Sequence, residues 1–294
     1  MRSRTATLAL QCSLFSSLVL GTCTRSGLNT ALDNFFANAI EKRPLNLAKT
    51  AKFSSDGYFV DSINQTSFGN ITALYKPDFK VQSLDTAACA CARYTVVTEK
   101  AKNGSVIPAL LSLRLLLDDN DGPIKEVEEM NILRGQHILF SPDRFDAKTP
   151  DIMTTSQATS STAKKMSRRE LINIANTYLE GVQSGNSSLV KGDPAFCPRI
   201  SNGYQTSSHC DKGMEQFKWP VEDRRWIADE ETGVVFGVFI FRQALMVDKN
   251  TGDYINEYIK VQDGMIKGIY ATMIYINKNI KSVWPDDKER KYNL

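Results

Sequence analysis

The chain has 294 residues, enough for one large domain or about two domains of ordinary size. Hydrophobic residues make up 42% and charged residues 23%, which excludes global disorder and collagen-like repeats. The 36 Lys and Arg residues nearly balance the 33 Asp and Glu residues, so we expect no nucleic-acid partner. The two histidines leave little material for a histidine-rich metal site, and we expect neither metal nor cofactor.

The first 21 residues have the pattern of a secretory signal peptide. Arg2 and Arg4 give a positive start, residues 8–20 form an apolar stretch, and residues 19–21 suit a signal peptidase. The stretch is shorter than the roughly 20 residues of a membrane-spanning helix, although a buried N-terminal helix is an alternative. We therefore expect a secreted protein, or one in the lumen of the secretory pathway, with no membrane span.

Four sequons for N-glycosylation agree with export. Each has the form Asn-x-Ser/Thr without proline in the middle, and a single sequon would be weak evidence because the tripeptide is frequent. We expect at least two of the four asparagines to carry glycans: Asn64, Asn70, Asn103 and Asn186.

Cysteine usage also fits an oxidising compartment. Cys197 and Cys210 lie 13 residues apart across a polar loop, which predicts a local disulfide. A loop of that size stabilises the fold by about 3 kcal/mol in the chain-entropy model. Cys23 is expected to pair with either Cys89 or Cys91, leaving one thiol over.

A repeat of long period organises the chain. The apolar positions of an amphipathic helix near the start recur in a second helix when 143 is added to each number. Ser167-Arg168-Arg169-Glu170 forms a capping box at the start of the second helix. The matching positions are 28, 32, 35, 36 and 39 in the first helix and 171, 175, 178, 179 and 182 in the second.

Later segments match at a similar offset. Asp56-Gly57-Tyr58 corresponds to Asn202-Gly203-Tyr204, and Gly122-Pro123-Ile124 corresponds to Gly264-Met265-Ile266. In both halves a long β-rich run turns at a polar segment containing Gly, which is a hairpin signal. Each half is therefore predicted to be α+β, with helices packed on a curved antiparallel sheet.

The repeat divides the chain into five predicted segments. The core of the segment between the halves, Thr154 to Thr162, has almost no apolar side chain, so we expect an exposed linker there. The segments are a signal peptide at 1–21, a first domain at 22–140, a Ser/Thr-rich linker at 141–166, a second domain at 167–284 and a charged tail at 285–294.

Several motifs resemble those of a known fold. They are Ala109 to Leu115 and Ile124 to Glu128 in the first half, and Cys197 to Thr206, Cys210 and Arg224 to Gly233 in the second. On these motifs each half resembles the nuclear-transport-factor-two-like cone, which scytalone dehydratase and small polyketide cyclases share. The mature chain as a whole resembles secreted fungal proteins that carry two such cones in tandem.

The chain departs from that family at three places. Ser201 stands where the family usually has Glu, and Ser54-Ser55-Asp56-Gly57 where it has Thr-Glu-Asn-Gly. Phe241-Arg242-Gln243 stands where it often has Phe-Asp-His. A carboxylate and a histidine are thus missing, and no role of those two groups is carried over.

The resemblance implies assembly as well as fold. Cones of this class often associate through their open sheets. We therefore expect two chains to form a homodimer. The near-constant offset of 142 to 146 between the halves separately predicts that the two cone-shaped domains pack as an internal pseudo-dimer.

The resemblance also implies natural-product chemistry without a cofactor. Cone-fold relatives act as dehydratases, isomerases and cyclases, and related fungal proteins catalyse dehydration followed by hetero-Diels–Alder closure in tropolone–sesquiterpenoid assembly. The sequence has no Gly-x-Ser-x-Gly, phosphate-binding Gly loop or His-Glu-x-x-His motif. The favoured hypothesis is an enzyme that dehydrates or cyclises a polyketide or terpenoid intermediate. The alternative is a non-catalytic secreted module that binds a small apolar ligand or a host partner.

The candidate catalytic groups are polar residues of both halves: Asp56, Arg114, His209 and Asp229. Asp56 precedes Gly and Tyr, as Asn202 does, and turn formation is the favoured alternative role. Arg114 lies within an apolar strand, where an ion pair with Glu126 or Glu128 is favoured over a substrate clamp.

A second group of residues is expected to bind the substrate: Tyr58, Glu128, Asn202, Tyr204, Trp226 and Tyr270. Aromatic side chains can stack on a flat unsaturated substrate. Trp226 fits the protein core equally well, and core packing is favoured for Tyr270 and the neighbouring tyrosines. An exposed loop position is the favoured alternative for His209.

Overall fold

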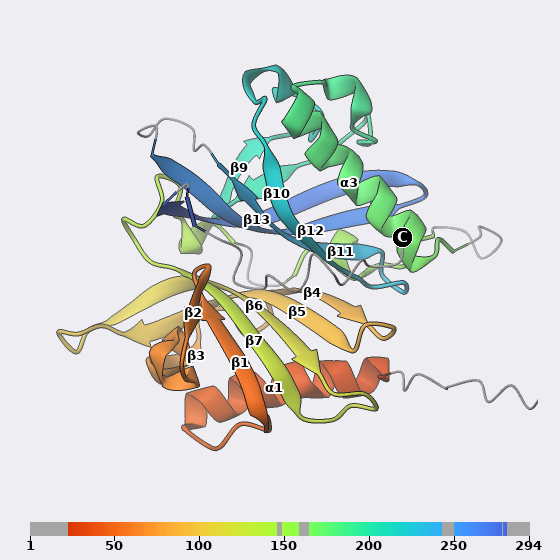
Figure 1. Ribbon diagram of the computed structural model, residues 1–294. Coiled ribbons are helices and arrows are strands. Elements are labelled where there is room, and N and C mark those ends of the chain that lie inside the picture. The colour runs from red at the N-terminus through yellow and green to blue at the C-terminus, as the bar shows by residue number, and fades with distance from the viewer. Residues whose placement is uncertain (1–22, 146–148, 159–164, 243–249, 278, 281–294) are drawn as a thin grey trace, which may run out of the picture.

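The computed structural model describes residues 23–145, 149–158, 165–242, 250–277 and 279–280. These residues form four layers (Figure 1): helix α1 (Arg25–Glu41), a seven-stranded sheet, a six-stranded sheet and helix α3 (Arg168–Ser184). The two sheets face each other, and one helix covers the outer face of each sheet. The predicted signal peptide and charged tail lie outside the described residues.

The first sheet has the strand order β2-β1-β7-β6-β5-β3, and β4 also pairs with β5. The short helices η1 (Ile63–Gln65) and η2 (Ser67–Gly69) lie between β2 and β3. The strands are β1 (Leu47–Ser55), β2 (Tyr58–Val60), β3 (Ile71–Leu74), β4 (Lys80–Asp85), β5 (Ala90–Lys100), β6 (Val106–Leu117) and β7 (Ile124–Ile132).

The second sheet has the strand order β10-β11-β12-β13-β8-β9. Three short helices precede its first strand in the chain. They are η3 (Pro142–Arg144) and α2 (Asp151–Thr154), both before α3, and η4 (Ser187–Leu189), after it. A further turn, η5 (Met214–Gln216), precedes β10. The strands are β8 (Arg199–Ser201), β9 (Tyr204–Ser207), β10 (Val221–Ala228), β11 (Val234–Phe241), β12 (Thr251–Gln262) and β13 (Met265–Asn277).

Apart from β3, which belongs to the first sheet alone, the two sheets have the same strand order, which confirms the α+β repeat. Six strands correspond in chain order: β1 to β8, β2 to β9, β4 to β10, β5 to β11, β6 to β12 and β7 to β13. Neither sheet is closed. Each is mixed, because β1 runs parallel to β7 and β8 runs parallel to β13. The sequence motifs did not predict this parallel pair, which forms when the chain returns from its last hairpin to the strand that follows the helix.

The helices form where local signals predict them. The Ser167 side chain accepts from the Glu170 backbone, and the Glu170 side chain accepts from the Ser167 backbone at 2.7 Å, which completes the capping box. At the start of α1, Thr24 Oγ1 accepts the Gly27 N–H at 2.9 Å. Each helix then buries its apolar stripe, Leu28 to Ala39 or Leu171 to Val182, against its own sheet.

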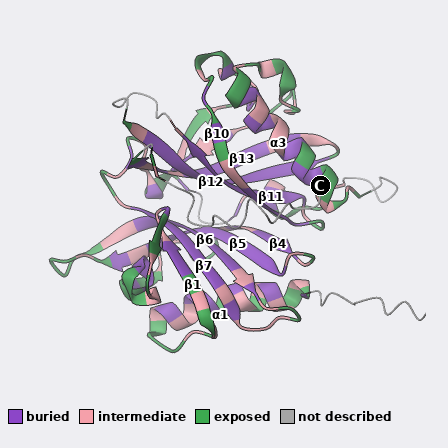
Figure 2. Ribbon diagram, in the orientation of Figure 1, coloured by how far each residue is buried: buried purple, intermediate pink, exposed green. Residues whose placement is uncertain are grey.

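The largest shared core lies between the sheets. Tyr94 stacks on Tyr258 with ring centroids 6.1 Å apart, and Phe236 packs 4.8 Å from Tyr258. Figure 2 shows these inward faces as buried along most of the strands. The Asn256 amide donates to Ser112 Oγ at 3.0 Å, and these two residues occupy equivalent places in the repeat. The halves therefore pack as an internal pseudo-dimer about an axis near this contact.

The described residues of the predicted linker are only partly exposed, and residues 146–148 and 159–164 lie outside the described part of the chain. Residues 154–156 are exposed, but Met153 and Gln157 are 3% and 1% exposed. The buried Lys260 ammonium donates to the carbonyl of Thr155 at 2.7 Å, and Gln262 donates to that of Ser156 at 2.9 Å. A buried ammonium requires such acceptors, so the segment is tied to β12 by its backbone rather than by apolar side chains.

The cysteines pair as the two disulfides Cys23–Cys89 and Cys197–Cys210. The sequence predicted the Cys197–Cys210 disulfide. The Cys23–Cys89 disulfide decides between Cys89 and Cys91, the two partners left open for Cys23. Cys91 is free and fully buried. The disulfides fit an oxidising compartment. Within the described ranges, no helix has both the length and the apolar character to cross a membrane.

Candidate functional site

Asp56 and Asn202 play the same backbone role in the two halves. Both adopt a left-handed backbone conformation, with φ of 51° and 47°, and each precedes a Gly of positive φ. Asp56 Oδ1 accepts the Asn131 N–H at 2.8 Å, and Asn202 Oδ1 accepts the Met273 N–H at 2.9 Å. The favoured turn interpretation therefore describes both positions, since each side chain ties its turn to the last strand of its own sheet.

Arg114 lies in a buried ion cluster between the sheets. Its Nε donates to Glu128 Oε2 at 2.6 Å and its Nη2 to Glu126 Oε2 at 3.0 Å, which are the two partners that the sequence offered. Arg225 and Tyr254, from the opposite sheet, both donate to Glu128 Oε1. Burial alone would raise the pKa of Glu128, but Arg225 and Arg114 outweigh it and hold the pKa at about 2. This cluster joins the two halves.

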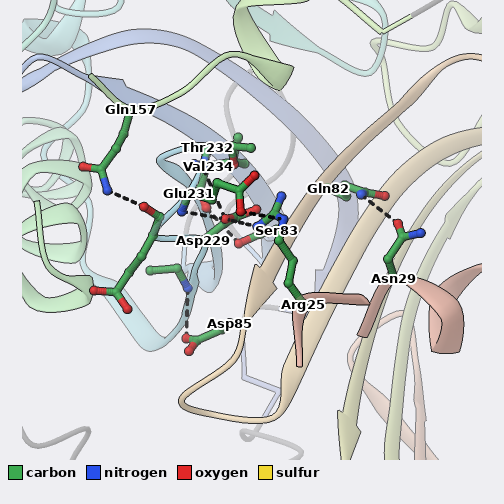
Figure 3. A network of polar contacts seen from close by, with 12 residues as sticks. Arg25, Asn29, Gln82, Ser83, Asp85, Gln157, Asp229, Glu231, Thr232 and Val234 are labelled. Carbon is green, nitrogen blue, oxygen red and sulfur yellow. Dashed lines mark hydrogen bonds and ion pairs between the residues drawn. The ribbon is translucent and has the colours of Figure 1, made fainter. Parts of the chain in front are cut away.

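Asp229 lies where the N-terminal ends of α1 and α3 meet the sheets (Figure 3). Arg25, the first residue of α1, pairs with the fully buried Asp229. Arg168, the first residue of α3, pairs with Asp85 at 2.6 Å, and Asp85 is 1% exposed. The two pairs are related by the repeat, because β4 ends at Asp85 as β10 ends just before Asp229.

A groove of about 850 Å³ adjoins these pairs. Arg25 Nε also lies 3.3 Å from Glu231 Oε2, and the Arg168 N–H donates to Glu230 Oε1 at 2.7 Å. The acidic groups of the groove are thus engaged with the chain itself. Its lining residues are Arg25, Leu84, Thr86, Lys165, Met166, Ser167, Arg169, Glu170, Asp229, Glu230 and Glu231.

The predicted catalytic residues lie in four separate parts of the fold. Asp56 is in the β1–β2 turn, Arg114 is on the inner face of the first sheet, and Asp229 follows β10. His209 is in the loop closed by the second disulfide, where its N–H donates to Ser207 Oγ at 3.1 Å. The structure does not bring these four side chains together.

The predicted substrate-binding residues are also dispersed. Tyr58 is 50% exposed on the edge strand β2, while Tyr270 belongs to the core between the sheets. Trp226 is in the core beneath α3 and packs on Gly237, where a Cβ would lie 2.6 Å from the indole ring. The Tyr204 ring lies 4.4 Å from the Arg144 guanidinium. Glu128 and Asn202 have the contacts described above.

The second domain contains a buried polar centre that motif reading missed. Glu257 on β12 is 3% exposed and points toward α3, as Ile255 and Ile259 do. Within the described residues, Glu257 Oε2 has no hydrogen-bond partner. Burial raises the pKa of Glu257 to about 8, against the opposing effect of the nearby Arg199. The carboxyl is therefore mostly protonated at neutral pH.

Arg199 and Tyr178 complete this centre. Arg199 Nη1 donates to the Tyr178 hydroxyl at 3.4 Å, and its Nε donates to Thr206 Oγ1 at 3.3 Å. Burial, and then the Glu257 charge, raise the pKa of Tyr178 to about 12, so its hydroxyl stays protonated. We call Tyr178, Arg199 and Glu257 the polar centre of the second domain.

The repeat shows that this centre is not needed to build the fold. In the first domain the equivalent positions are Phe35, Phe53 and Leu113, all buried and apolar. An unpaired buried acceptor costs about 1–3 kcal/mol, so an apolar residue would serve packing better at position 257. Aligning the halves strand by strand would have revealed Glu257 as a charged residue at an apolar position. Such costly buried groups cluster at functional sites.

The centre combines a proton donor, a fixed cation and a hydroxyl. A neutral carboxyl of raised pKa can act as a general acid near pH 7 and as a base after it loses its proton. The guanidinium can stabilise negative charge that develops on a substrate oxygen. Among the residues that the structure describes, no group of three or more His, Cys, Asp or Glu side chains could hold a metal ion.

Comparison with known proteins bears on the second half of the chain. Residues 164–273 match a family described as a domain of unknown function (DUF8021). The match runs from the start of α3 into β13 and includes all three residues of the polar centre. No curated protein matches the chain. The C-terminal half thus carries a DUF8021 domain.

Proposed function

We propose that the protein is a secreted, cofactor-independent enzyme that dehydrates or cyclises a hydroxylated polyketide or terpenoid intermediate. Glu257 carries the proposal, because it is a buried carboxyl whose Oε2 has no hydrogen-bond partner among the described residues and whose pKa burial raises to about 8. The resemblance of the motifs to tandem-cone fungal proteins supports the substrate class. Fold resemblance alone does not assign an activity, so the proposal rests on the site.

The polar centre suits an acid–base elimination. Protonated Glu257 donates its proton to the substrate hydroxyl, and the C–O bond breaks with both electrons remaining on the departing water. The Glu257 carboxylate then takes a proton from an adjacent C–H or O–H, and that electron pair forms the new double bond. The sum is loss of one water, and Glu257 regains its proton.

Arg199 would stabilise the oxygen that gains negative charge as the proton leaves. Arg199 is 9% exposed, and a charge acts more strongly in a buried site than in water. A conjugated product could then close a ring with a second alkene. That closure moves no proton, and holding both partners in place can lower its barrier by several kcal/mol.

The test compares two carboxyl variants on the same face of β12. Glu257→Gln removes the proposed acid, and Asp253→Asn is the matched control because burial also raises the pKa of Asp253 to about 7. The probe is a hydroxylated tropolone precursor supplied with a sesquiterpene alkene. We expect E257Q to lower kcat at least a hundredfold, within the range of general acid–base catalysis. D253N should leave kcat nearly unchanged.

The pH profile separates catalysis from binding. The wild-type rate should fall as the pH rises above about 8, because Glu257 then loses the proton that it donates. E257Q should lack this limb. Racemic product at the uncatalysed rate, with the precursor still bound, would refute the enzyme and support the alternative of a ligand-binding module.

A further inference from the structure

We propose that three carboxyl groups of the first domain form a pH-sensitive clasp that holds residues 63–69 on the first sheet in mild acid and loosens them as the pH rises. The carboxyl clasp consists of Asp56 in the β1–β2 turn, Glu99 on β5 and Glu129 on β7. This inference is independent of the proposed activity, which is placed in the other domain.

Glu129 makes the contacts that hold the segment. It is fully buried, and its Oε1 accepts the Ser67 N–H at 2.7 Å and the Ser55 hydroxyl at 2.8 Å. Its Oε2 accepts the Ser67 hydroxyl at 2.5 Å. Ser67 begins η2 and Ser55 ends β1, so one carboxyl joins η2, β1 and β7.

Glu99 is only partly satisfied by hydrogen bonds. It is 5% exposed and hydrogen-bonds the Asn131 side chain. Within the described residues, Glu99 Oε1 and Asn131 Oδ1 have no partner. Two acceptor oxygens without a donor are costly in a dry site, whereas a protonated carboxyl supplies an O–H donor. The geometry therefore favours the neutral form of Glu99.

Asp56 and Glu99 both lie within the electrostatic reach of Glu129. Burial, and next the Glu129 charge, raise the pKa of Asp56 and of Glu99 to about 7. A cation, Lys42 at the end of α1, acts on Glu99. Its ammonium donates to the carbonyls of Phe68, Gly69 and Ile71 at 3.2, 3.0 and 2.8 Å, and it only partly offsets the rise for Glu99.

The direction of the pH response follows from these shifts. A carboxyl with a raised pKa binds its proton more tightly in the closed form than in the open, hydrated form. The stability of the closed form therefore falls as the pH rises from about 4, near the ordinary carboxyl pKa, to about 7. Above that range it stays at its lower value, because both forms are then ionised.

The second domain provides an internal reference without the clasp. The places of Asp56, Glu129 and Asn131 are taken there by Asn202, Ala271 and Met273. Asn202 makes the same turn contact with an amide oxygen that Asp56 makes with a carboxyl oxygen. Asp56→Asn should therefore preserve the fold of the first domain while removing one titrating group.

Hydrogen exchange of the full-length secreted protein at pH 5 and pH 8, corrected for intrinsic rates, tests the clasp. Peptides covering 63–71 should lose protection by roughly tenfold or more, relative to peptides from β11, whose residues carry no titratable side chain. D56N and Glu99→Gln should each reduce that loss, and D56N serves if E99Q fails to fold. An undiminished loss in D56N, or an equal loss in the β11 peptides, would overturn the proposal.

Discussion

Arg25 pairs with Asp229 across the two domains, and the repeat reproduces this pair as Arg168 with Asp85. In each case the first residue of a helix contacts an Asp at the end of an edge strand of the other half. Reciprocal contacts of this kind mark a self-complementary interface of two-fold symmetry. The two domains are therefore joined as the subunits of a symmetric dimer would be, with the covalent linker added.

Removing one arginine should destabilise the whole chain. Arg25→Met leaves Asp229 buried with its carboxylate partly unpaired, and we expect a loss of roughly 3 kcal/mol, the low end for a broken buried pair because Arg25 is partly exposed. Urea unfolding measures it. Asp229→Asn in the same chain should restore part of the loss. Arg43→Ala, which removes an exposed pair with Glu41, should change stability by less than about 0.5 kcal/mol.

The central ion cluster should give acid-dependent stability. The folded pKa of Glu128 is about 2 and lies below the ordinary Glu value, so its contribution is complete above about pH 4.5 and disappears as the pH falls through 2. Glu128→Gln should lower the free energy of unfolding at pH 7. Near pH 2 the free energies of unfolding of the variant and of wild type should differ less. Thermal unfolding across this range measures both effects, and a constant difference would contradict the assignment.

Cys91 should be inert until the protein unfolds. It is fully buried, and burial raises the pKa of its thiol to about 12. Iodoacetamide should therefore leave the native mature protein unmodified and add one label per chain in urea. Non-reducing peptide mapping should return Cys23 with Cys89 and Cys197 with Cys210. Labelling of the native protein would show that the first domain opens locally.

Gly237 should not tolerate a side chain. A Cβ there would lie 2.6 Å from the Trp226 ring, and the tightly packed core beneath α3 gives the indole little room to shift. We expect Gly237→Ala to cost about 1–3 kcal/mol, as overpacking does elsewhere. Gly69→Ala is the control, since its nearest neighbour would be 3.8 Å away. Equal unfolding midpoints for the two variants would show that Trp226 moves aside.

The four sequons should accept glycans without disturbing the fold. All four asparagines are exposed in the structure, so a carbohydrate can project into solvent from any of them. Intact mass before and after enzymatic deglycosylation counts the occupied sites, and we expect at least two. An unmodified chain that retains Met1 in its native host would refute the secretory assignment.

Local rules predicted much of the architecture because each half repeats them. The offset between the helices, the capping box at Ser167 and the paired turns at Asp56 and Asn202 all depend on short-range chemistry. The partners of Arg114 were also predictable, because neighbouring strands of a hairpin place opposite charges side by side.

What the sequence could not supply was the direction in which side chains point and which distant groups meet. Glu257 lies in a strand whose two faces are both buried, so alternation did not distinguish its side from that of Lys260. The choice of Cys89 over Cys91 depends on where the N-terminal segment lies, and the Cys23 N–H donates to the carbonyl of Thr86, close to Cys89 in the chain. The parallel pairing of β1 with β7 is equally a long-range result.

The burial of both open sheet faces within one chain changes how this protein responds to concentration. A single domain that needs a second copy to cover its open sheet loses stability on dilution, because its partner must be found by collision. Here the linker supplies the partner at a fixed effective concentration. The unfolding midpoint should thus be independent of dilution, and a homodimer would have to use a surface other than the one that the two halves bury against each other.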